Sequence, residues 1–463
     1  MQDATGGELR HVILCAIGSS GDVHPFVGLG RALRQRGYRV TLVTNGYFRT
    51  LVEQAGLEFV DPLPQVDFRE MIRNPLIWHP LRGPRTIIDL AVRPLLEPVY
   101  RSILTHHTPG HTLVCGSSLA FGARVAQETT GIPLVSVHLS PAIFRSNFEG
   151  PRVPGLCVHH GPAWFRSVQW YLADVLVADR MIRPWLNAFR GSLGRPAVSR
   201  VIRDWMHSPL RMIAMFPEWF APWQPDWPPQ TRLTGFPLYS EEGVVEPSPM
   251  VQRFIEEGPP PLVFTPGSAN VFGRDFFLAA VDACRRLGRR GLLLTRFPEQ
   301  VPASLPDGVR HVDFVPFRWL LGRSAMLVHH GGIGSLSQAL AAGVPQVIMP
   351  MGFDQFDNAA RVERLGVGRS LPPKRFRGTS LADTIRGLLA DPAVAGHCRT
   401  AAARLANTDG LERACDEIED AWAHHGAMAP WRHGTMAPWH HGTMAPWHHE
   451  QTVFTKPAAH VRE

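Results

Sequence analysis

The sequence predicts an α/β protein of two Rossmann-like domains, each built on a parallel β-sheet, that face one another across a central cleft. Three observations support this fold class. The chain has 463 residues, more than one ordinary core holds, which suggests two domains of about 200 residues each. Short apolar runs alternate with helical segments in both halves. A stretch dense in proline and tryptophan, FPEWFAPWQPDWPP at 216–229, separates the halves.

The first half begins with a βαβ unit. Its first apolar strand ends in a turn with Gly18 and Gly21, and Pro25 is expected in the first turn of the following helix. The predicted elements are strand 11–17, helix 25–36, strand 38–44, strand 112–115, helix 119–129, strand 133–138, strand 261–265, helix 276–287, strand 291–295, strand 325–328 and strand 346–350. Such alternation forms parallel sheets with helices on both faces.

These elements predict the domain boundaries. Residues 1–222 form the N-terminal, acceptor-binding domain, 223–240 the linker, and 241–422 the C-terminal domain that binds a nucleotide sugar. In the remaining segment, 423–463, the units HGAMAPWR, HGTMAPWH and HGTMAPWH follow one another. Three short units with Gly and Pro are too brief for a solenoid, so we expect a disordered tail. Its histidines are candidates for loose metal binding, although repeat expansion in a structureless terminus is the favoured explanation.

The overall composition favours a globular protein that does not bind nucleic acid. Hydrophobic residues make up 44% of the chain and charged residues 19%, and the formal net charge is +7. Nearly all the basic residues are arginines, and no dense Lys/Arg block appears. A mild attraction to phosphate ligands or to anionic lipid surfaces remains open.

Cysteine usage and hydropathy predict a cytoplasmic location. The six cysteines are widely spaced and form no CxxC pair, as expected of core residues in a reducing compartment. The N-terminal sequence MQDATGGELRHVILCAIG does not resemble a signal peptide. No run of about 18 apolar residues is present, so no transmembrane helix is expected, and membrane contact would be peripheral, at the inner membrane.

The segment 329–358, HHGGIGSLSQALAAGVPQVIMPMGFDQFDN, predicts a site for a nucleotide diphosphate. A strand ends in a His-Gly-Gly turn at His330, and a helix begins near Gly334 and Ser335. The glycines, Gly332 among them, allow close approach of a ligand to the backbone, and the helix N-terminus favours an anion. His330 adds a side-chain donor. The alternative is an ordinary strand-to-helix turn that happens to carry glycines.

A second strand, 346–350, leads into Asp354 and Gln355. Both side chains suit hydrogen bonds to vicinal sugar hydroxyls, and they follow the carboxyl end of a parallel strand, where open α/β sheets bind ligands. With these ordered motifs the chain resembles the two-domain nucleotide-sugar glycosyltransferases of the GT-B fold, the family 1 or UDP-glycosyltransferase superfamily. The resemblance implies a C-terminal helix, near 411–422, that crosses back onto the first domain.

The resemblance also implies a general base at the first βα turn. The superfamily usually has His one residue after a glycine and three before a proline, and the matching residue here is Asp22. A carboxylate there takes the proton of an acceptor hydroxyl as it attacks the anomeric carbon with inversion. The helix dipole tends to keep Asp22 ionised and so makes it a weaker base. The alternative is a plain N-cap, and the two roles are compatible.

His24 is the rival base. Because it precedes Pro25, its backbone is expected to be extended, which would aim its ring elsewhere. The superfamily's usual second acid, which orients a histidine base, is absent because Gly116 and Ser117 stand in its place.

On the donor side, the resemblance assigns further roles. Gly267 and Ser268 match a phosphate-touching loop, and Gly18 and Gly21 form the corresponding loop of the first domain. Phe314 would stack on the nucleobase while the Val315 backbone bonds its edge. Gln338 stands where many members have a ribose-binding Glu, which favours dTDP over UDP. No Asp-x-Asp metal motif lies near these residues, and the nucleotide sugar is a substrate, so neither a metal nor a cofactor is expected.

A narrower resemblance, from about 10 to 421, concerns the catalytic rhamnosyltransferases of bacterial mono-rhamnolipid synthesis. It rests on IGSSGDVHPFVGLGRAL, WMHSP, FPEWFAPWQPDWPP, TGFPL, LVFTPGS, and LAAGVPQVIMP followed by FDQFDNA. It implies dTDP-L-rhamnose as donor and a hydroxyalkanoyloxy-alkanoate as acceptor. Aromatic residues between 164 and 220 would line a hydrophobic acceptor groove or belong to the core; they include Trp164, Phe165, Trp170, Trp185 and Trp205.

Other functions remain open at this point. One is a UDP-glucose-dependent glucosyltransferase of sterols, polyketides or other small aglycones. Another is a nucleotide-sugar 2-epimerase of similar fold, which needs no acceptor base. A nucleotide-sugar-binding protein without turnover is the non-enzymatic alternative.

Overall fold

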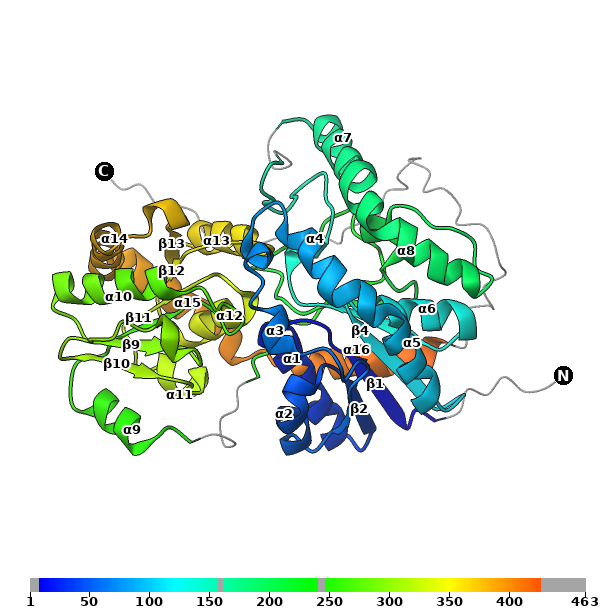
Figure 1. The fold of residues 1–463 in the computed structure, drawn as a ribbon, viewed down its shortest axis with the longest axis horizontal. Coiled ribbons are helices and arrows are strands. Elements are labelled where there is room, and N and C mark those ends of the chain that lie inside the picture. The colour runs from blue at the N-terminus through cyan, green and yellow to red at the C-terminus, as the bar shows by residue number, and fades with distance from the viewer. Residues whose placement is uncertain (1–7, 157–160, 240–245, 426–463) are drawn as a thin grey trace, which may run out of the picture. The chain divides into compact units, whose positions relative to one another are not determined.

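The computed structural model describes residues 8–156, 161–239 and 246–425, all within one compact unit. The three histidine-rich repeats and the predicted disordered tail lie outside the described residues, apart from its first residues. The described part contains two parallel sheets, one in each half of the chain (Figure 1). The predicted α/β class with two parallel sheets is thus confirmed.

The first sheet has seven strands in the order β3-β2-β1-β4-β5-β6-β7, all parallel. The strands are β1 (His11–Cys15), β2 (Arg39–Val43), β3 (Glu58–Val60), β4 (Thr112–Ser117), β5 (Leu134–His138), β6 (Arg211–Ala214) and β7 (Thr231–Leu233). Strands β1 and β5 are buried along their full length, as expected for a parallel sheet covered on both faces. The strand order reverses between β1 and β4, so ligands are expected at the carboxyl ends of these strands.

The second sheet has six parallel strands in the order β10-β9-β8-β11-β12-β13. The strands are β8 (Leu262–Thr265), β9 (Gly291–Leu294), β10 (Val309–Val312), β11 (Met326–His329), β12 (Gln346–Ile348) and β13 (Gly368–Ser370). Here the order reverses between β8 and β11, which places the turn after β11 at the switch point.

Helices connect the strands of both sheets. The α-helices are α1 (Ser20–Gln35), α2 (Arg49–Gln54), α3 (Phe68–Met71), α4 (Gly83–Ile87), α5 (Arg93–His106), α6 (Phe121–Thr130), α7 (Ala163–Ala173), α8 (Asp179–Ser192), α9 (Pro249–Glu256), α10 (Arg274–Leu287), α11 (Phe317–Leu321), α12 (Ile333–Ala342), α13 (Gln355–Arg364), α14 (Gly378–Ala390), α15 (Pro392–Ala406) and α16 (Gly410–His425). The 3-10 and π segments are η1 (Gly46–Phe48), η2 (Pro75–Trp78), η3 (Ile88–Val92), η4 (Pro141–Ile143), η5 (Asp174–Ala178), η6 (Val201–Trp205), η7 (Pro298–Gln300) and η8 (Pro373–Arg375).

Helix α1 differs from its prediction. It begins at Ser20, five residues before Pro25, so His24 is helical and not extended. The cause is the capping interaction of Ser19 with Asp22, which starts the helix early. Pro25 then occupies the second turn of the helix.

The predicted linker 223–240 also contains regular structure. Strand β7 lies within it and pairs with β6, which extends the first sheet by one strand. Three residues flanked by prolines give too weak a signal in sequence to be recognised as a strand.

The C-terminal helix α16 packs on the first half, as the resemblance implied. It lies against α1, and its buried residues Ala414, Cys415 and Ile418 join the hydrophobic core of the first sheet. Arg36 of α1 holds it through ion pairs with Glu412, Asp416 and Glu419 of α16. The chain therefore ends on the half in which it began.

A buried ion pair within α13 makes further contacts with the first half on another side. Arg361 donates from Nε to Asp357 Oδ2 at 2.7 Å, and both side chains are almost fully buried. The Arg361 Nη1 donates to the Phe220 carbonyl at 3.1 Å and contacts Glu149 Oε1 at 3.3 Å. The second oxygen of Asp357 accepts the Arg152 amide at 2.9 Å. Helix α13, which carries both members of the pair, is thereby fixed against the first half.

The five cysteines in the described part of the chain are buried and form no disulfide with one another, while Cys157 lies outside it. Within the described ranges, no helix is both long enough and apolar enough to cross a bilayer.

Candidate functional site

The turn after β11 is organised by a buried histidine that sequence analysis did not select. His329 accepts the Gly331 amide at Nδ1, at 3.1 Å, and therefore donates from Nε2 to Gln346 Oε1 at 3.0 Å. Burial, with a smaller contribution from neighbouring His330, lowers the pKa of His329 to about 3, so the ring is neutral. The His329 side chain thus fixes the glycine turn from beneath.

His330 lies between two of the predicted glycines. A Cβ at Gly267 would come within 2.8 Å of its Cε1, and a Cβ at Gly332 within 2.5 Å of its Nε2. Both positions therefore need glycine because the imidazole occupies the space. Burial lowers the pKa of His330 to about 4, and its buried Nδ1 has no hydrogen-bond partner among the described residues. His330 is thus a neutral ring with an unused polar atom.

The N-terminus of α12 carries no side-chain cap. Its N-cap is Gly332, whereas α9 and α15 are capped by Ser248 and Asp391. No neighbouring atom crowds Gly334, and Ser335 is half-buried in the same first turn. Uncapped amides at the positive end of a ten-residue helix favour an anion.

Asp354 and Gln355 play different parts. Gln355 Oε1 accepts the amides of Met351 and Gly352, at 2.8 and 3.2 Å, so this buried side chain shapes its own loop. Asp354 is half-buried and accepts Asn358 Nδ2 at 2.8 Å. The same Asn358 nitrogen donates to the Gly331 carbonyl at 2.9 Å, which ties the glycine turn to the Asp354 loop. Sequence analysis missed Asn358.

Asp22 follows β1 and holds the start of α1. Its Oδ2 accepts the Ser19 amide at 2.7 Å and the Ser19 hydroxyl at 3.1 Å, which leaves Oδ1 without a protein partner in the described residues. Gly18 has φ 140°, and a Cβ there would lie 2.2 Å from Asp22 Oδ2. Gly21 is exposed, with only the Ser19 hydroxyl near an added Cβ. The N-cap is therefore Ser19 and not Asp22, which is the third residue of the helix and completes a capping box through one oxygen.

The carboxylates of Asp22 and Asp354 interact although they come from different halves. Burial and then the negative charge of Asp22 raise the pKa of Asp354 to about 6, while hydrogen bonds from Asn358 and Ser140 lower it. Burial also raises the pKa of Asp22, against the two Ser19 hydrogen bonds. Burial thus outweighs the effect expected from the helix dipole, and Asp22 is a stronger base than the sequence predicts.

His24 lies beside Tyr239. The two rings meet edge to face at a centroid distance of 6.2 Å. Burial, and then the charge of Arg296, lower the pKa of His24 to about 4. Gln338 Nε2 donates to the Tyr239 carbonyl at 3.0 Å. The side chain that was expected near a ribose therefore also holds the backbone at Tyr239.

The nucleobase candidates are only partly exposed. Val315 is buried in the core of the second half, which leaves its backbone as the recognition element. Phe314 is half-buried, and the Arg296 guanidinium lies 5.1 Å from its ring centroid. Ser268 is exposed after β8. Arg296, which sequence analysis did not select, thus lies between Phe314 and the region of His24.

The first half also contains a chain of hydrogen-bonded polar side chains that is largely buried. Ser118 Oγ is 2.8 Å from His138 Nδ1, and His138 Nε2 is 3.2 Å from His207 Nδ1. Burial lowers the pKa of His138 well below its usual value and that of His207 to about 3. His138 is the last residue of β5 and His207 precedes β6, whereas the sequence analysis considered only Gly116 and Ser117 at the end of β4.

The aromatic residues considered for an acceptor groove do not act as one set. Trp170 and Trp205 are buried core residues, and Trp185 is half-buried. Trp164 and Phe165 are exposed instead. The spacing of aromatic residues in sequence could not separate these environments, because it does not show which helix face meets the sheet.

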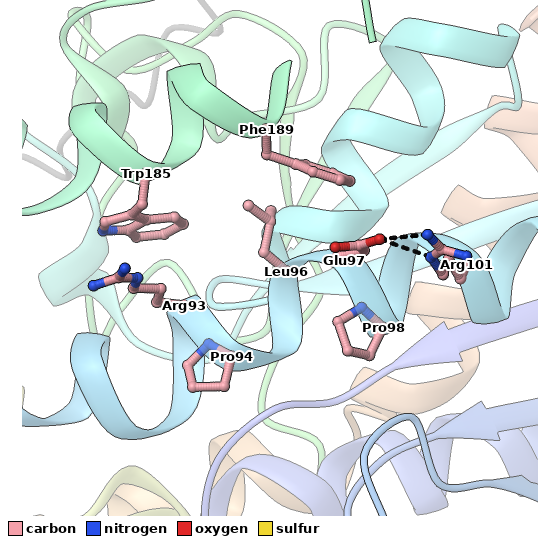
Figure 2. A pocket seen from close by; sticks show the side chains of 8 residues that line it. All are labelled: Arg93, Pro94, Leu96, Glu97, Pro98, Arg101, Trp185 and Phe189. Atoms are coloured by element: carbon pink, nitrogen blue, oxygen red, sulfur yellow. Dashed lines mark hydrogen bonds and ion pairs between the residues drawn. The ribbon is translucent and has the colours of Figure 1, made fainter. Parts of the chain in front are cut away.

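A pocket of about 390 Å³ between α5 and α8 is separate from these residues (Figure 2). It is lined by Arg93, Pro94, Leu96, Glu97, Pro98, Arg101, Trp185 and Phe189. Trp185 is the single candidate residue among them, and no donor-side or base candidate takes part. Across the described ranges, no group of three or more His, Cys, Asp or Glu side chains could hold a metal ion.

Comparison with known proteins identifies similar families and relatives. Residues 12–147 match the sequence profile of the glycosyltransferase family 28 N-terminal domain, and residues 295–426 match the erythromycin biosynthesis protein CIII-like C-terminal domain. The chain is 33% identical over 435 residues to O-mycaminosyltylonolide 6-deoxyallosyltransferase of Streptomyces fradiae, which covers 89% of this chain and 97% of the relative. It is 25% identical to a sterol 3-beta-glucosyltransferase of Arabidopsis thaliana, over 88% of this chain and 67% of the relative.

Solved structures share the fold. The glycosyltransferase of kitacinnamycin superposes with a TM-score of 0.66 at 21% identity, over 89% of this chain and 99% of that one. The calicheamicin glycosyltransferase gives 0.64 at 22% identity, over 91% and 100%. The spinosyn rhamnosyltransferase complexed with thymidine diphosphate gives 0.59 at 17% identity, over 89% and 100%.

Proposed function

Because this chain belongs to the nucleotide-sugar-dependent glycosyltransferases of the GT-B fold, we propose that it transfers a 6-deoxyhexose from a dTDP-linked donor to a hydroxyl of a hydrophobic acceptor, with inversion. One observation carries this proposal. The carboxylates of Asp22 and Asp354, from opposite halves, lie close enough for one charge to raise the pKa of the other. A base candidate thus adjoins a sugar-binding candidate.

In the proposed reaction, Asp22 takes the proton of the acceptor hydroxyl through its free Oδ1. The hydroxyl oxygen forms a bond to the anomeric carbon as the bond to the diphosphate oxygen breaks on the opposite face, which inverts the configuration. The first-turn amides of α12, the Ser335 hydroxyl and His330 stabilise the departing diphosphate. Asp354 orients the sugar through its hydroxyls, and Asn358 holds Asp354 against the glycine turn.

The donor assignment is supported by the names of two similar proteins and by the position of Gln338. The Streptomyces relative is named for transfer of a 6-deoxyallosyl group, and one similar structure is of a rhamnosyltransferase complexed with thymidine diphosphate. The Gln338 amide nitrogen donates to the Tyr239 carbonyl, which leaves the single Oε1 to accept a ribose hydroxyl where a glutamate offers two acceptor oxygens. This arrangement suits a 2′-deoxyribose. Within this class we propose dTDP-L-rhamnose as the first donor to test.

The acceptor is proposed to be lipid-like, with hydroxyalkanoyloxy-alkanoate as the first compound to test. The named relatives act on other skeletons, a glycosylated tylonolide and a sterol, so the rhamnolipid assignment rests on the sequence resemblance alone. The sterol relative favours the second candidate, a UDP-glucose-dependent glucosyltransferase of small aglycones. Membership of the glycosyltransferases favours transfer over 2-epimerisation. We assign the acceptor to residues 1–222 and the donor to 241–422, with α16 returned to the first half.

The deciding experiment is a mass-spectrometric transfer assay with purified protein. Purified protein is offered dTDP-L-rhamnose or UDP-glucose, each with the hydroxyalkanoyloxy-alkanoate, a sterol and a tylonolide-type macrolide, with and without EDTA. Rhamnosylated alkanoate, formed equally with EDTA, is the expected product. If glucosyl sterol forms instead, the second candidate replaces the first. If no product forms while dTDP and UDP fail to raise the thermal midpoint, the donor site itself is misassigned.

The pH profile should respond in opposite directions to two substitutions. An aspartate base works when ionised, so kcat/KM falls as the pH drops through its pKa. Ser19→Ala removes a hydrogen bond that lowers the pKa of Asp22, so the acid limb should move to higher pH. Asp354→Asn removes a neighbouring negative charge, so the limb should move to lower pH. Initial rates between pH 4 and about 9 measure both, with the position of the limb as the readout. Two limbs that stay in place would argue against Asp22 as the titrating base.

A further inference from the structure

Helix α7 and the π-helical η5 that continues it expose an apolar face. Seven side chains on them, called here the outer stripe, are between 41% and 69% exposed: Trp164, Phe165, Val168, Tyr171, Leu172, Leu176 and Val177. Their spacing of three and four residues places them along one side of the helix. Figure 1 shows α7 at the top of the view.

The opposite side of α7 is already fixed to the first half. Trp170 is 1% exposed, and its Nε1 donates to the Ser146 carbonyl at 3.0 Å. The Arg145 guanidinium lies 4.3 Å from the Trp170 ring centroid and pairs with Asp174 at 3.1 Å. The helix is therefore firmly attached, and its apolar face is not exposed because of loose packing. Its polar anchor faces inward and its apolar stripe faces outward, the reverse of an ordinary surface helix.

The charges around the outer stripe are of one sign. Between 161 and 183 the acidic residues are Asp174 and Asp179, and both are 2% exposed. Asp179 accepts the amides of Arg200 and Val201. The basic side chains of the same stretch, Arg166, Arg180 and Arg183, reach solvent. The visible surface of this segment is therefore apolar and cationic, with no exposed acid.

We propose that the outer stripe and its arginines dock the first half onto an anionic lipid surface. Trp and Tyr favour the interface between water and hydrocarbon, and aliphatic side chains beside them add buried apolar area. Arginines next to such a face are attracted to anionic headgroups. The segment from 163 to 178 is too short to span a bilayer, so it lies in the plane of the interface. This inference does not depend on the identity of the sugar or acceptor.

Vesicle sedimentation with the full chain tests this proposal without any turnover. The vesicles are phosphatidylcholine alone or phosphatidylcholine with about 30% phosphatidylglycerol, enough anionic lipid for a surface potential. We expect binding to the anionic vesicles and at least tenfold weaker binding to the neutral ones. The variant Trp164→Ser/Tyr171→Ser/Leu176→Ser should reduce binding by about tenfold or more, since each side chain loses a buried apolar contact.

A matched control comes from exposed apolar residues elsewhere. Leu81, Met250 and Leu278 are between 45% and 71% exposed, and Leu81→Ser/Met250→Ser/Leu278→Ser should leave binding unchanged. The variant Arg180→Gln/Arg183→Gln should remove most of the preference for anionic vesicles and most of the salt dependence. Because the stripe and control positions are exposed, their thermal midpoints should stay close to that of the unsubstituted protein, while Arg183→Gln also loses a hydrogen bond to the Val198 carbonyl and is compared with Arg180→Gln alone.

Three results would overturn the proposal. One is equal vesicle binding by the stripe variant and the control. Another is a raised acceptor KM with unchanged vesicle binding, which would make the stripe part of the acceptor site. The third is a self-association seen by analytical ultracentrifugation that the stripe variant abolishes while vesicles bind neither protein, which would make a second copy the occupant.

Discussion

Asp22→Asn should lower kcat by about 10²- to 10⁴-fold, the usual contribution of a general base. This corresponds to about 3–5 kcal/mol in the barrier. The amide keeps the shape of the carboxylate, and its oxygen can still accept the Ser19 amide, so α1 should begin at the same residue. The side chain can no longer take a proton from the acceptor hydroxyl. The loss should therefore appear in turnover, with no loss of donor binding.

The measurement is steady-state transfer together with the thermal shift caused by the donor nucleotide. Asp391→Asn is the control, because Asp391 also accepts a backbone amide at a helix start, that of Ala393 in α15, but is exposed and outside the candidate site. It should change kcat by less than about twofold, as a surface substitution does. His24→Asn tests the rival base in the same assay. If the His24 variant is inactive while Asp22→Asn retains full activity, the assignment of the base is wrong.

Arg361→Met should lower the free energy of unfolding by about 3–5 kcal/mol, because it leaves the Asp357 carboxylate buried without its cation. Asp357 would retain the Arg152 amide at 2.9 Å, which does not balance a buried charge. The substitution also removes the Arg361 hydrogen bond to the Phe220 carbonyl in the first half. Helix α13 would lose its main polar attachment to that half, and Asp354 precedes this helix directly.

Differential scanning calorimetry should show the thermal midpoint lowered by about 3–6 °C, given an unfolding entropy near 2.1 cal/mol/K per residue. The control is Arg364→Met, three residues further along α13. Arg364 also contacts Glu149 and the Phe220 carbonyl, but its side chain is 48% exposed, so its loss should cost less than about 1 kcal/mol. Equal effects of the two variants would show that burial of the ion pair does not decide the result. Replacing both partners, with Asp357→Leu/Arg361→Met, should restore most of the stability.

Much of the fold could be predicted from local patterns. The apolar runs that became β1, β4, β5, β8, β9 and β11 are fully or largely buried strands, and their alternation with helices was sufficient to predict two parallel sheets. The donor turn was also visible, since a strand, a glycine turn and a helix start follow one another within a few residues. These features depend on neighbours in sequence.

Local patterns failed in two ways: a capping interaction close in sequence was overlooked, and partners far along the chain left no signal. Pro25 suggested a helix start, but the Ser19 and Asp22 interaction moved that start to Ser20. The glycines at 267 and 332 were attributed to a ligand, yet the His330 ring between them already requires both. Trp164 and Trp170 are the same residue type in the same helix, yet Trp164 faces solvent and Trp170 faces the core.

Strand and helix periodicity and short motifs are encoded within a few positions, so the two sheets and the residue types at the donor turn could be predicted from the chain alone. Folding is what brings Asp22 and Asp354 together, joins two loops through Asn358 and turns the apolar stripe on α7 outward. Each of these depends on which surfaces meet after folding. The physical reason is that burial and charge coupling are set by distances in space, and residues 332 positions apart in the chain have no local pattern that records them.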